Sequence, residues 1–169
     1  GIPTATLRSW VLGRDYKVAD GTRRFAPIIE IADRKRRLLS FVNLVEAHVL
    51  SALRREHAIQ LPKVRTAIAY LRNHLHSRHP LADQQFETDG LDLFVQKYGT
   101  LINITRDGQL AMRNVLQSFL KRVKRDAQGA PVKLYLFVRG AIDEPFAVVV
   151  DPAVSFGRPV LEGTGIPPE

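Results

Sequence analysis

Side chains that could bind a phosphate group or a nucleic-acid base are concentrated near the start of the sequence. The six that rank first are Thr4, Thr6, Arg8, Ser9, Arg23 and Arg24, and Arg14 and Lys17 rank second. Hydroxyl and guanidinium groups donate hydrogen bonds to phosphate oxygens, and an arginine can hold the edge of a guanine with two hydrogen bonds. These residue types therefore favour nucleic-acid recognition over catalysis.

The net charge of the chain favours the same chemistry. The formal charge is +8, and residues 1–83 carry 15 Lys and Arg against 7 Asp and Glu, whereas residues 84–169 carry 10 against 10. A basic excess confined to one segment is expected of a surface that neutralises phosphates. A solvated basic face that binds nothing specific is the alternative interpretation.

Two further groups of side chains could in principle hold a metal ion. They are His74, His76 and His79 in one segment, and Glu87, Asp89 and Asp92 in another. The histidines lie where there is little periodicity, which indicates a solvated loop rather than a zinc site. The carboxylates could serve a metal-dependent nuclease, but a polar strand edge is the simpler interpretation because no suitably placed lysine or histidine pair accompanies them. We expect no metal, no cofactor and no enzymatic activity.

The elements that must position the basic residues can be predicted from start signals and periodicity. A helix is expected over residues 4–11, with Leu7, Trp10 and Val11 facing a core, and Gly13 can end it. An Asp-Gly turn predicts a hairpin with a basic tip over residues 16–29. A capped, strongly periodic helix follows over residues 40–53, and another, with a proline near its first turn, over residues 61–75.

The second half of the sequence has a different pattern. Residues 74–85 show little periodicity and indicate a linker between two units. Alternating apolar residues around a glycine then predict a hairpin over residues 91–104. A helix over residues 110–123 and strands over residues 132–138 and 146–150 complete an α+β unit whose sheet is mostly antiparallel.

The order of helix, basic hairpin and two helices resembles a MerR-like winged helix-turn-helix. Residues 1–10 resemble that family's recognition helix, Thr22–Phe25 its wing, and Phe41–Val45 the helix that follows. Residues 53–65 are similar to the continuation of that domain, although Ala58 stands where the family usually has glycine. The first helix of the helix-turn-helix pair is missing, so we expect this chain to be a piece of a longer DNA-binding protein and to bind DNA weakly or not at all.

The end of the sequence carries a second resemblance. Residues 157–167 resemble the opening of a small helix-turn-helix domain of bacterial antitoxins, although Gly165 stands where arginine is usual. Together the two ends resemble VapB-type antitoxins of VapBC systems. The expected domains are residues 1–75, a MerR-like winged helix-turn-helix; residues 84–150, an α+β unit for dimerisation or partner binding; and residues 151–169, the start of a truncated helix-turn-helix domain.

The resemblance implies an antitoxin that neutralises a PIN-domain ribonuclease toxin and binds operator DNA as an autorepressor, usually as a homodimer. A cytoplasmic location is expected, because the sequence has no cysteine and no apolar run long enough to span a bilayer. A MerR-like regulator without a toxin partner, or a protein-interaction module whose basic head binds nothing specific, remain alternatives.

Overall fold

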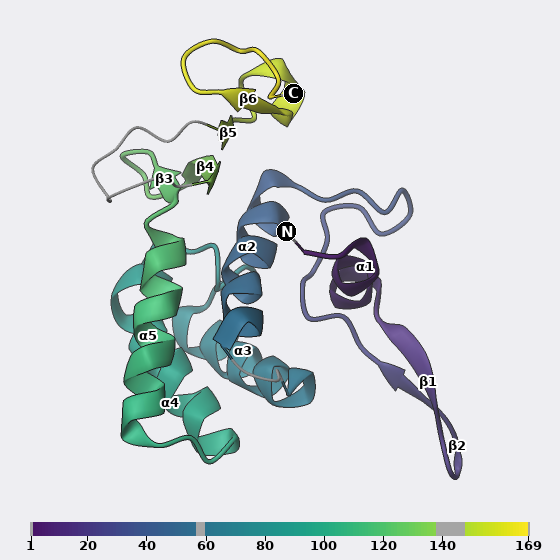
Figure 1. Ribbon diagram of the computed structural model, residues 1–169. Coiled ribbons are helices and arrows are strands. Elements are labelled where there is room, and N and C mark those ends of the chain that lie inside the picture. Colours follow the sequence, from purple (N-terminus) through teal and green to yellow (C-terminus); the bar gives the residue numbers. More distant parts are fainter. Residues whose placement is uncertain (1, 57–59, 138–147, 169) are drawn as a thin grey trace.

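The computed structural model describes residues 2–56, 60–137 and 148–168. It contains helices as well as two antiparallel sheets, one of two strands and one of four, which confirms the α+β class. In Figure 1 the helices α2 to α5 lie together, the four-stranded sheet lies at one end of them, and α1 with the hairpin lies to one side. Within the described residues, no helix combines the length and apolar character that crossing a bilayer requires.

The first elements form as predicted. Helix α1 spans Thr4–Leu12 and ends at Gly13, and the hairpin consists of β1, Arg14–Val18, and β2, Gly21–Phe25. The strands pair antiparallel up to the tight turn at residues 19 and 20. The hairpin is shorter than predicted, because the chain beyond Phe25 is irregular and its Ile28 and Ile29 amides donate to the Trp10 carbonyl instead of extending a strand.

The next two helices also match the prediction. Helix α2 spans Phe41–Glu56, and the hydroxyl of Ser40 accepts a hydrogen bond from the Asn43 amide, as an N-cap residue does. Helix α3 spans Leu61–Leu75 with a proline in its first turn. Their apolar stripes are buried in the main core.

The predicted hairpin at residues 91–104 is wrong. A π-helical turn, Phe86–Gly90, leads into helix α4, Leu91–Leu101, and a short turn connects it to helix α5, Arg106–Leu120. The residues that α4 buries include Leu91, Phe94, Val95 and Tyr98, whose spacing is helical, so the alternation that suggested a strand was accidental. The helix predicted at residues 110–123 is confirmed up to Leu120.

The larger sheet has the order β3-β4-β5-β6, with every neighbouring pair antiparallel. Its strands are β3, Val123–Arg125; β4, Pro131–Phe137; β5, Val148–Val150; and β6, Pro159–Leu161. The two predicted strands are confirmed as far as the described residues reach. Residues 159–161, which we expected to open a separate domain, form a strand that pairs with β5 and so extends this sheet.

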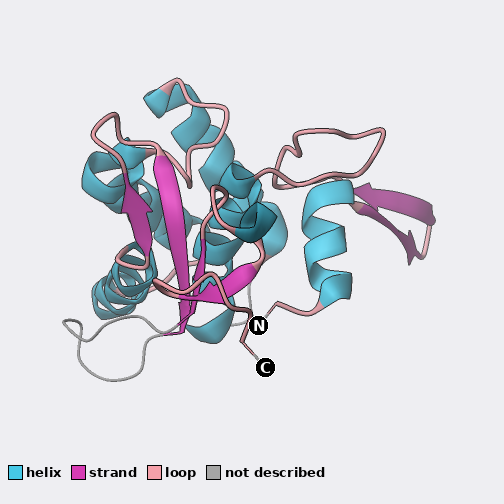
Figure 2. Cartoon of the chain, turned by 90° about the horizontal axis from the view of Figure 1, so that it is seen from above, coloured by secondary structure: helices cyan, strands magenta, loops and turns pink. Residues whose placement is uncertain are grey.

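One hydrophobic cluster connects the two halves of the chain. It runs from Trp10 on α1 through α2, α3 and α4 to Leu120 on α5, and it includes Leu81 from the segment that we expected to be a linker. A smaller cluster joins α2 to the sheet through Val45, Leu134 and Val150. Residues 1–75 and 84–120 therefore share one core, and Figure 2 shows the sheet and the helices from above, with α1 and the hairpin on the outer side.

Candidate nucleic-acid interface

Helix α1 presents a polar face to solvent. Trp10 and Val11 are buried, and their side chains fix which way the helix faces. Thr4 and Arg8, one helical turn apart, are exposed, whereas Thr6 and Ser9 lie further round the helix and are partly exposed. Thr4 and Arg8 therefore share one side of the helix, whereas Thr6, two residues from each of them, lies on nearly the opposite side. Arg8 is the only charged residue of α1.

The hairpin projects from the body of the protein beyond the C-terminal end of α1 (Figure 1). Tyr16 pairs with Arg23, and Asp15 pairs with Arg24. Because successive residues of a strand point to opposite faces, Arg23 and Arg24 diverge and the structure does not bring them together. Arg24 lies 3.5 Å from the Asp15 carboxylate and 3.5 Å from the Leu12 carbonyl, with both charged side chains largely exposed.

A cluster of four consecutive exposed cations lies on the loop between the hairpin and α2. They are Arg34, Lys35, Arg36 and Arg37, which we call the basic loop. None of these four residues is among the candidates named from the sequence. The run of charge was visible, but nothing in the sequence indicated that it would lie beside α1.

The basic loop has a closed and well-supported backbone. Asp33 and Leu38 exchange two backbone hydrogen bonds, of 3.3 and 3.0 Å, and the Asp33 carboxylate accepts from the Arg36 amide at 2.9 Å. Asn43, only 1% exposed, accepts from the Ala32 and Ser40 amides, each at 3.1 Å, and donates to the Glu30 carbonyl at 2.8 Å. One buried amide side chain therefore holds both ends of the loop.

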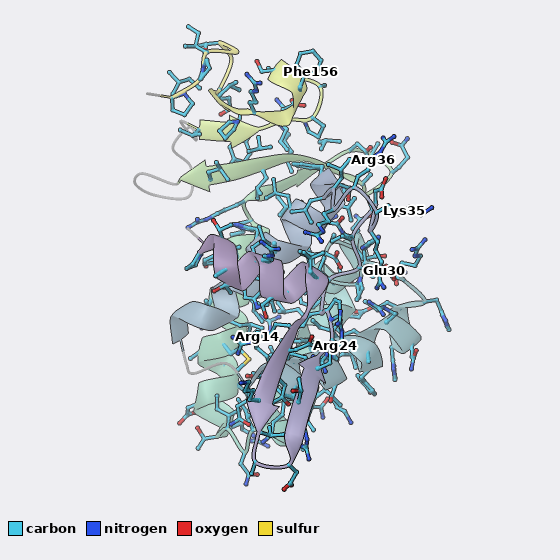
Figure 3. The ribbon with its side chains drawn as sticks, turned by 90° about the vertical axis from the view of Figure 1, so that its right-hand side faces the viewer. Arg14, Arg24, Glu30, Lys35, Arg36 and Phe156 are labelled. Atoms are coloured by element: carbon cyan, nitrogen blue, oxygen red, sulfur yellow. The ribbon has the colours of Figure 1, made fainter. Side chains whose placement is uncertain are left out.

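Figure 3 shows the face on which these elements meet: α1 crosses it, the hairpin with Arg14 and Arg24 lies below, and Lys35 and Arg36 lie above. Within the described residues, eight exposed cations on α1, the hairpin and the basic loop have no ion-pair partner. They are Arg8, Arg14, Lys17, Arg23, Arg34, Lys35, Arg36 and Arg37. Glu30 is an acidic residue nearby, and its hydrogen bond from Arg78 lowers its pKa, so it stays ionised and paired.

Four of the six residues considered for metal binding have other partners. The His74 ring lies 3.2 Å from the Tyr70 carbonyl, and His79 lies 2.9 Å from the Glu46 carboxylate. Asp92 pairs with Arg113. Glu87 pairs with Arg125 on β3, and the acidic residues lie on a helical segment rather than at a strand edge. Across the described residues, no group of three or more His, Asp or Glu side chains is arranged to hold a metal ion.

One buried carboxyl group with a histidine partner was not foreseen. The Glu46 carboxyl is 3% exposed, and burial raises its pKa, against the hydrogen bonds from His79 and Asn43 that lower it. Asn43 thus contacts both the basic loop and this pair, with its amide 3.3 Å from Glu46 Oε2. Glu46 and His79 lie far apart in sequence, so no local pattern announces them.

No protein-family profile matches the chain. A Mycobacterium tuberculosis protein named "Putative antitoxin VapB45" is 26% identical over 182 residues, which cover 98% of this chain and 73% of that protein. The X-ray crystal structure of Rv2018 from Mycobacterium tuberculosis is similar with a TM-score of 0.63 and 21% identity, over 98% of this chain and 76% of that one. The chain therefore shares a fold with the second protein and is a weak relative of a protein named as an antitoxin.

Proposed function

We propose that this protein is the antitoxin of a type II toxin–antitoxin system, which neutralises a PIN-domain ribonuclease toxin and binds operator DNA as an autorepressor. It acts in the cytoplasm, as a homodimer on a two-fold symmetric operator. The observation that carries the DNA-binding part is the face formed by α1, the hairpin and the basic loop, where exposed cations lie on both sides of one exposed helix.

The DNA-binding part follows from helix geometry and charge. A helix can enter the major groove, where Arg8 reaches a guanine edge or a phosphate while Thr4, Thr6 and Ser9 donate to bases or phosphates. The hairpin cations contact the backbone alongside, as a wing does. In this arrangement α1 has the role of a MerR-like recognition helix.

The antitoxin part rests on the relative's name and on the similarity that extends over nearly the whole chain. Antitoxin action requires a second surface for the toxin, outside the basic face. The same protein without a toxin partner would be a MerR-like regulator, and this is the second candidate function.

The test measures binding of the purified protein, expressed from its complete gene, to labelled promoter DNA and to scrambled DNA across a salt series. Arg8→Ala should weaken promoter binding by about tenfold or more, as removal of a base or phosphate contact does. Arg106→Ala is the matched control, because Arg106 is exposed at the start of α5, away from this face, and should have no effect. Equal weak binding to both DNAs, unaffected by Arg8→Ala, would contradict the proposal.

The antitoxin part needs a separate assay. If the neighbouring gene encodes a PIN-domain protein, that protein should cleave RNA alone and lose activity when this protein is added in equal amount. Full ribonuclease activity in the presence of this protein would contradict the antitoxin role and leave the role of a DNA-binding regulator. Incubating this protein alone with nucleic acid and Mg²⁺ or Mn²⁺ tests the alternative that it is a metal-dependent nuclease. Nucleic acid that stays intact would exclude this alternative.

A further inference from the structure

We propose that the basic loop is a second phosphate-binding arm, and that Arg37 and Arg8 together hold one phosphodiester of the bound DNA. The inference rests on the proposed function, because DNA is the ligand, but it assigns a role to residues outside the predicted helix and wing. It means that the protein contacts the DNA backbone on both sides of α1.

The basic loop has a fixed shape. A basic run that served only solubility would need no fixed shape. This loop, however, is closed on itself by Asp33 and anchored at both ends by Asn43. Arg37 adopts the left-handed conformation, with φ of 57°, which few non-glycine residues adopt. The backbone therefore presents the four side chains in a defined direction, and less conformational entropy is lost when they bind.

The basic loop also shares a cavity with α1. Its volume is about 240 Å³. The residues that line it are Thr4, Leu7, Arg8, Val11, Leu12, Arg37 and Leu39. Two arginines from different elements and a threonine thus line this space together with aliphatic side chains. A phosphate between two arginines, with its deoxyribose against the aliphatic side chains, satisfies both parts of this lining.

Helix α1 lies between two basic arms. In Figures 1 and 3 the basic loop lies above α1 and the hairpin lies below it. A helix in the major groove has a phosphate backbone on either side. One arm can therefore contact each strand, which is the arrangement that fixes the angle and depth of a recognition helix.

An acidic protein segment could also be attracted to four cations, but the double-arginine cavity next to the exposed face of α1 favours a phosphodiester. The Arg34→Gln/Lys35→Gln/Arg36→Gln triple variant separates the two. It should weaken binding to promoter and scrambled DNA alike, by about tenfold to hundredfold at about 150 mM salt, because phosphate contacts carry no sequence information. The slope of log affinity against log salt should fall by about 0.9 for each phosphate that the variant no longer neutralises.

A matched control removes the same formal charge elsewhere. Lys121, Lys124 and Arg158 are exposed at the end of α5, on β3 and before β6, so Lys121→Gln/Lys124→Gln/Arg158→Gln should leave affinity and salt slope unchanged. Urea unfolding followed by the fluorescence of Trp10, the single tryptophan, verifies that both triple variants fold.

The shared phosphate is tested with Arg8→Ala, Arg37→Ala and the double variant. If both arginines hold one phosphate, the double variant should lose less affinity than the product of the two single losses. Independent, multiplicative losses would overturn the shared site. If wild-type protein binds no DNA, the proposed function fails; if it binds DNA and the loop triple variant matches the control triple variant, only this inference fails.

Discussion

Replacing Asn43 tests the physical basis of the interface most directly. Its side chain makes four hydrogen bonds inside the protein: it accepts from the Ala32 and Ser40 amides, and it donates to the Glu30 carbonyl and to the Glu46 carboxylate. A net contribution of about 1 kcal/mol for each bond gives about 4 kcal/mol. Alanine recovers about 0.6 kcal/mol through its higher helix propensity, so Asn43→Ala should lower the free energy of unfolding by about 3 kcal/mol.

Urea unfolding followed by the fluorescence of the fully buried Trp10 gives this number. Asn73→Ala is the matched control, because Asn73 is exposed on α3 and its replacement should change stability by less than about 0.7 kcal/mol. Hydrogen exchange supplies a local measurement, since the Ala32 and Ser40 amides lose their acceptor and should exchange faster. A destabilisation below about 1 kcal/mol with unchanged exchange at these two amides would refute the role given to Asn43.

Three further predictions concern single positions. Burial raises the pKa of Glu46 above its ordinary value of 4.5, so the protonated carboxyl stabilises the fold below pH 4.5, and this stabilisation is lost as pH rises through the raised pKa. In urea unfolding series at successive pH values, Glu46→Gln should therefore lose less stability than the wild type over this pH range. Parallel curves for the two proteins would contradict the prediction. Gly13→Ala should lower the midpoint of thermal unfolding and reduce the free energy of unfolding by at least about 2 kcal/mol. Gly13 has φ of 75° and ψ of −179°, and a Cβ there would clash with the Phe25 carbonyl. An unchanged midpoint would show that the backbone relaxes. Phe156→Asn should stabilise by about 0.5–1 kcal/mol in urea, because Phe156 is fully exposed and left-handed, with φ of 55°; a destabilised variant would reveal a contact that its exposure does not show.

The first half of the fold could be predicted because its signals are local. Gly13 ends α1, Gly21 with φ of 131° follows the hairpin turn at residues 19 and 20, and the Ser40 hydroxyl caps α2. Each of these residues acts on the backbone within a few residues. The exposed face of α1 followed from the same reasoning, since Trp10 and Val11 had to face the core. Candidate residues on this helix could therefore be named from the sequence alone.

Helix α4 was mistaken because its apolar residues fit two periods. Leu91, Leu93 and Val95 alternate as in a strand, whereas Leu91, Phe94 and Val95 lie on one side of a helix. Gly99, which suggested a turn, lies within α4, where Gln109 of α5 packs close to its Cα. Its lack of a side chain allows that close approach, and this reason depends on a residue from another helix.

The basic loop was missed for a different reason, because its role depends on tertiary contacts that have no sequence pattern. Four cations in a row are typical of a solvated connection, and only the position of Asn43 on α2 turns this connection into an ordered arm. Arg37 and Arg8 line one cavity, which lies between α1 and the loop that follows the hairpin in the sequence. Charge identified the segment of the chain that could bind a polyanion, whereas packing decides which of its cations lie next to one another.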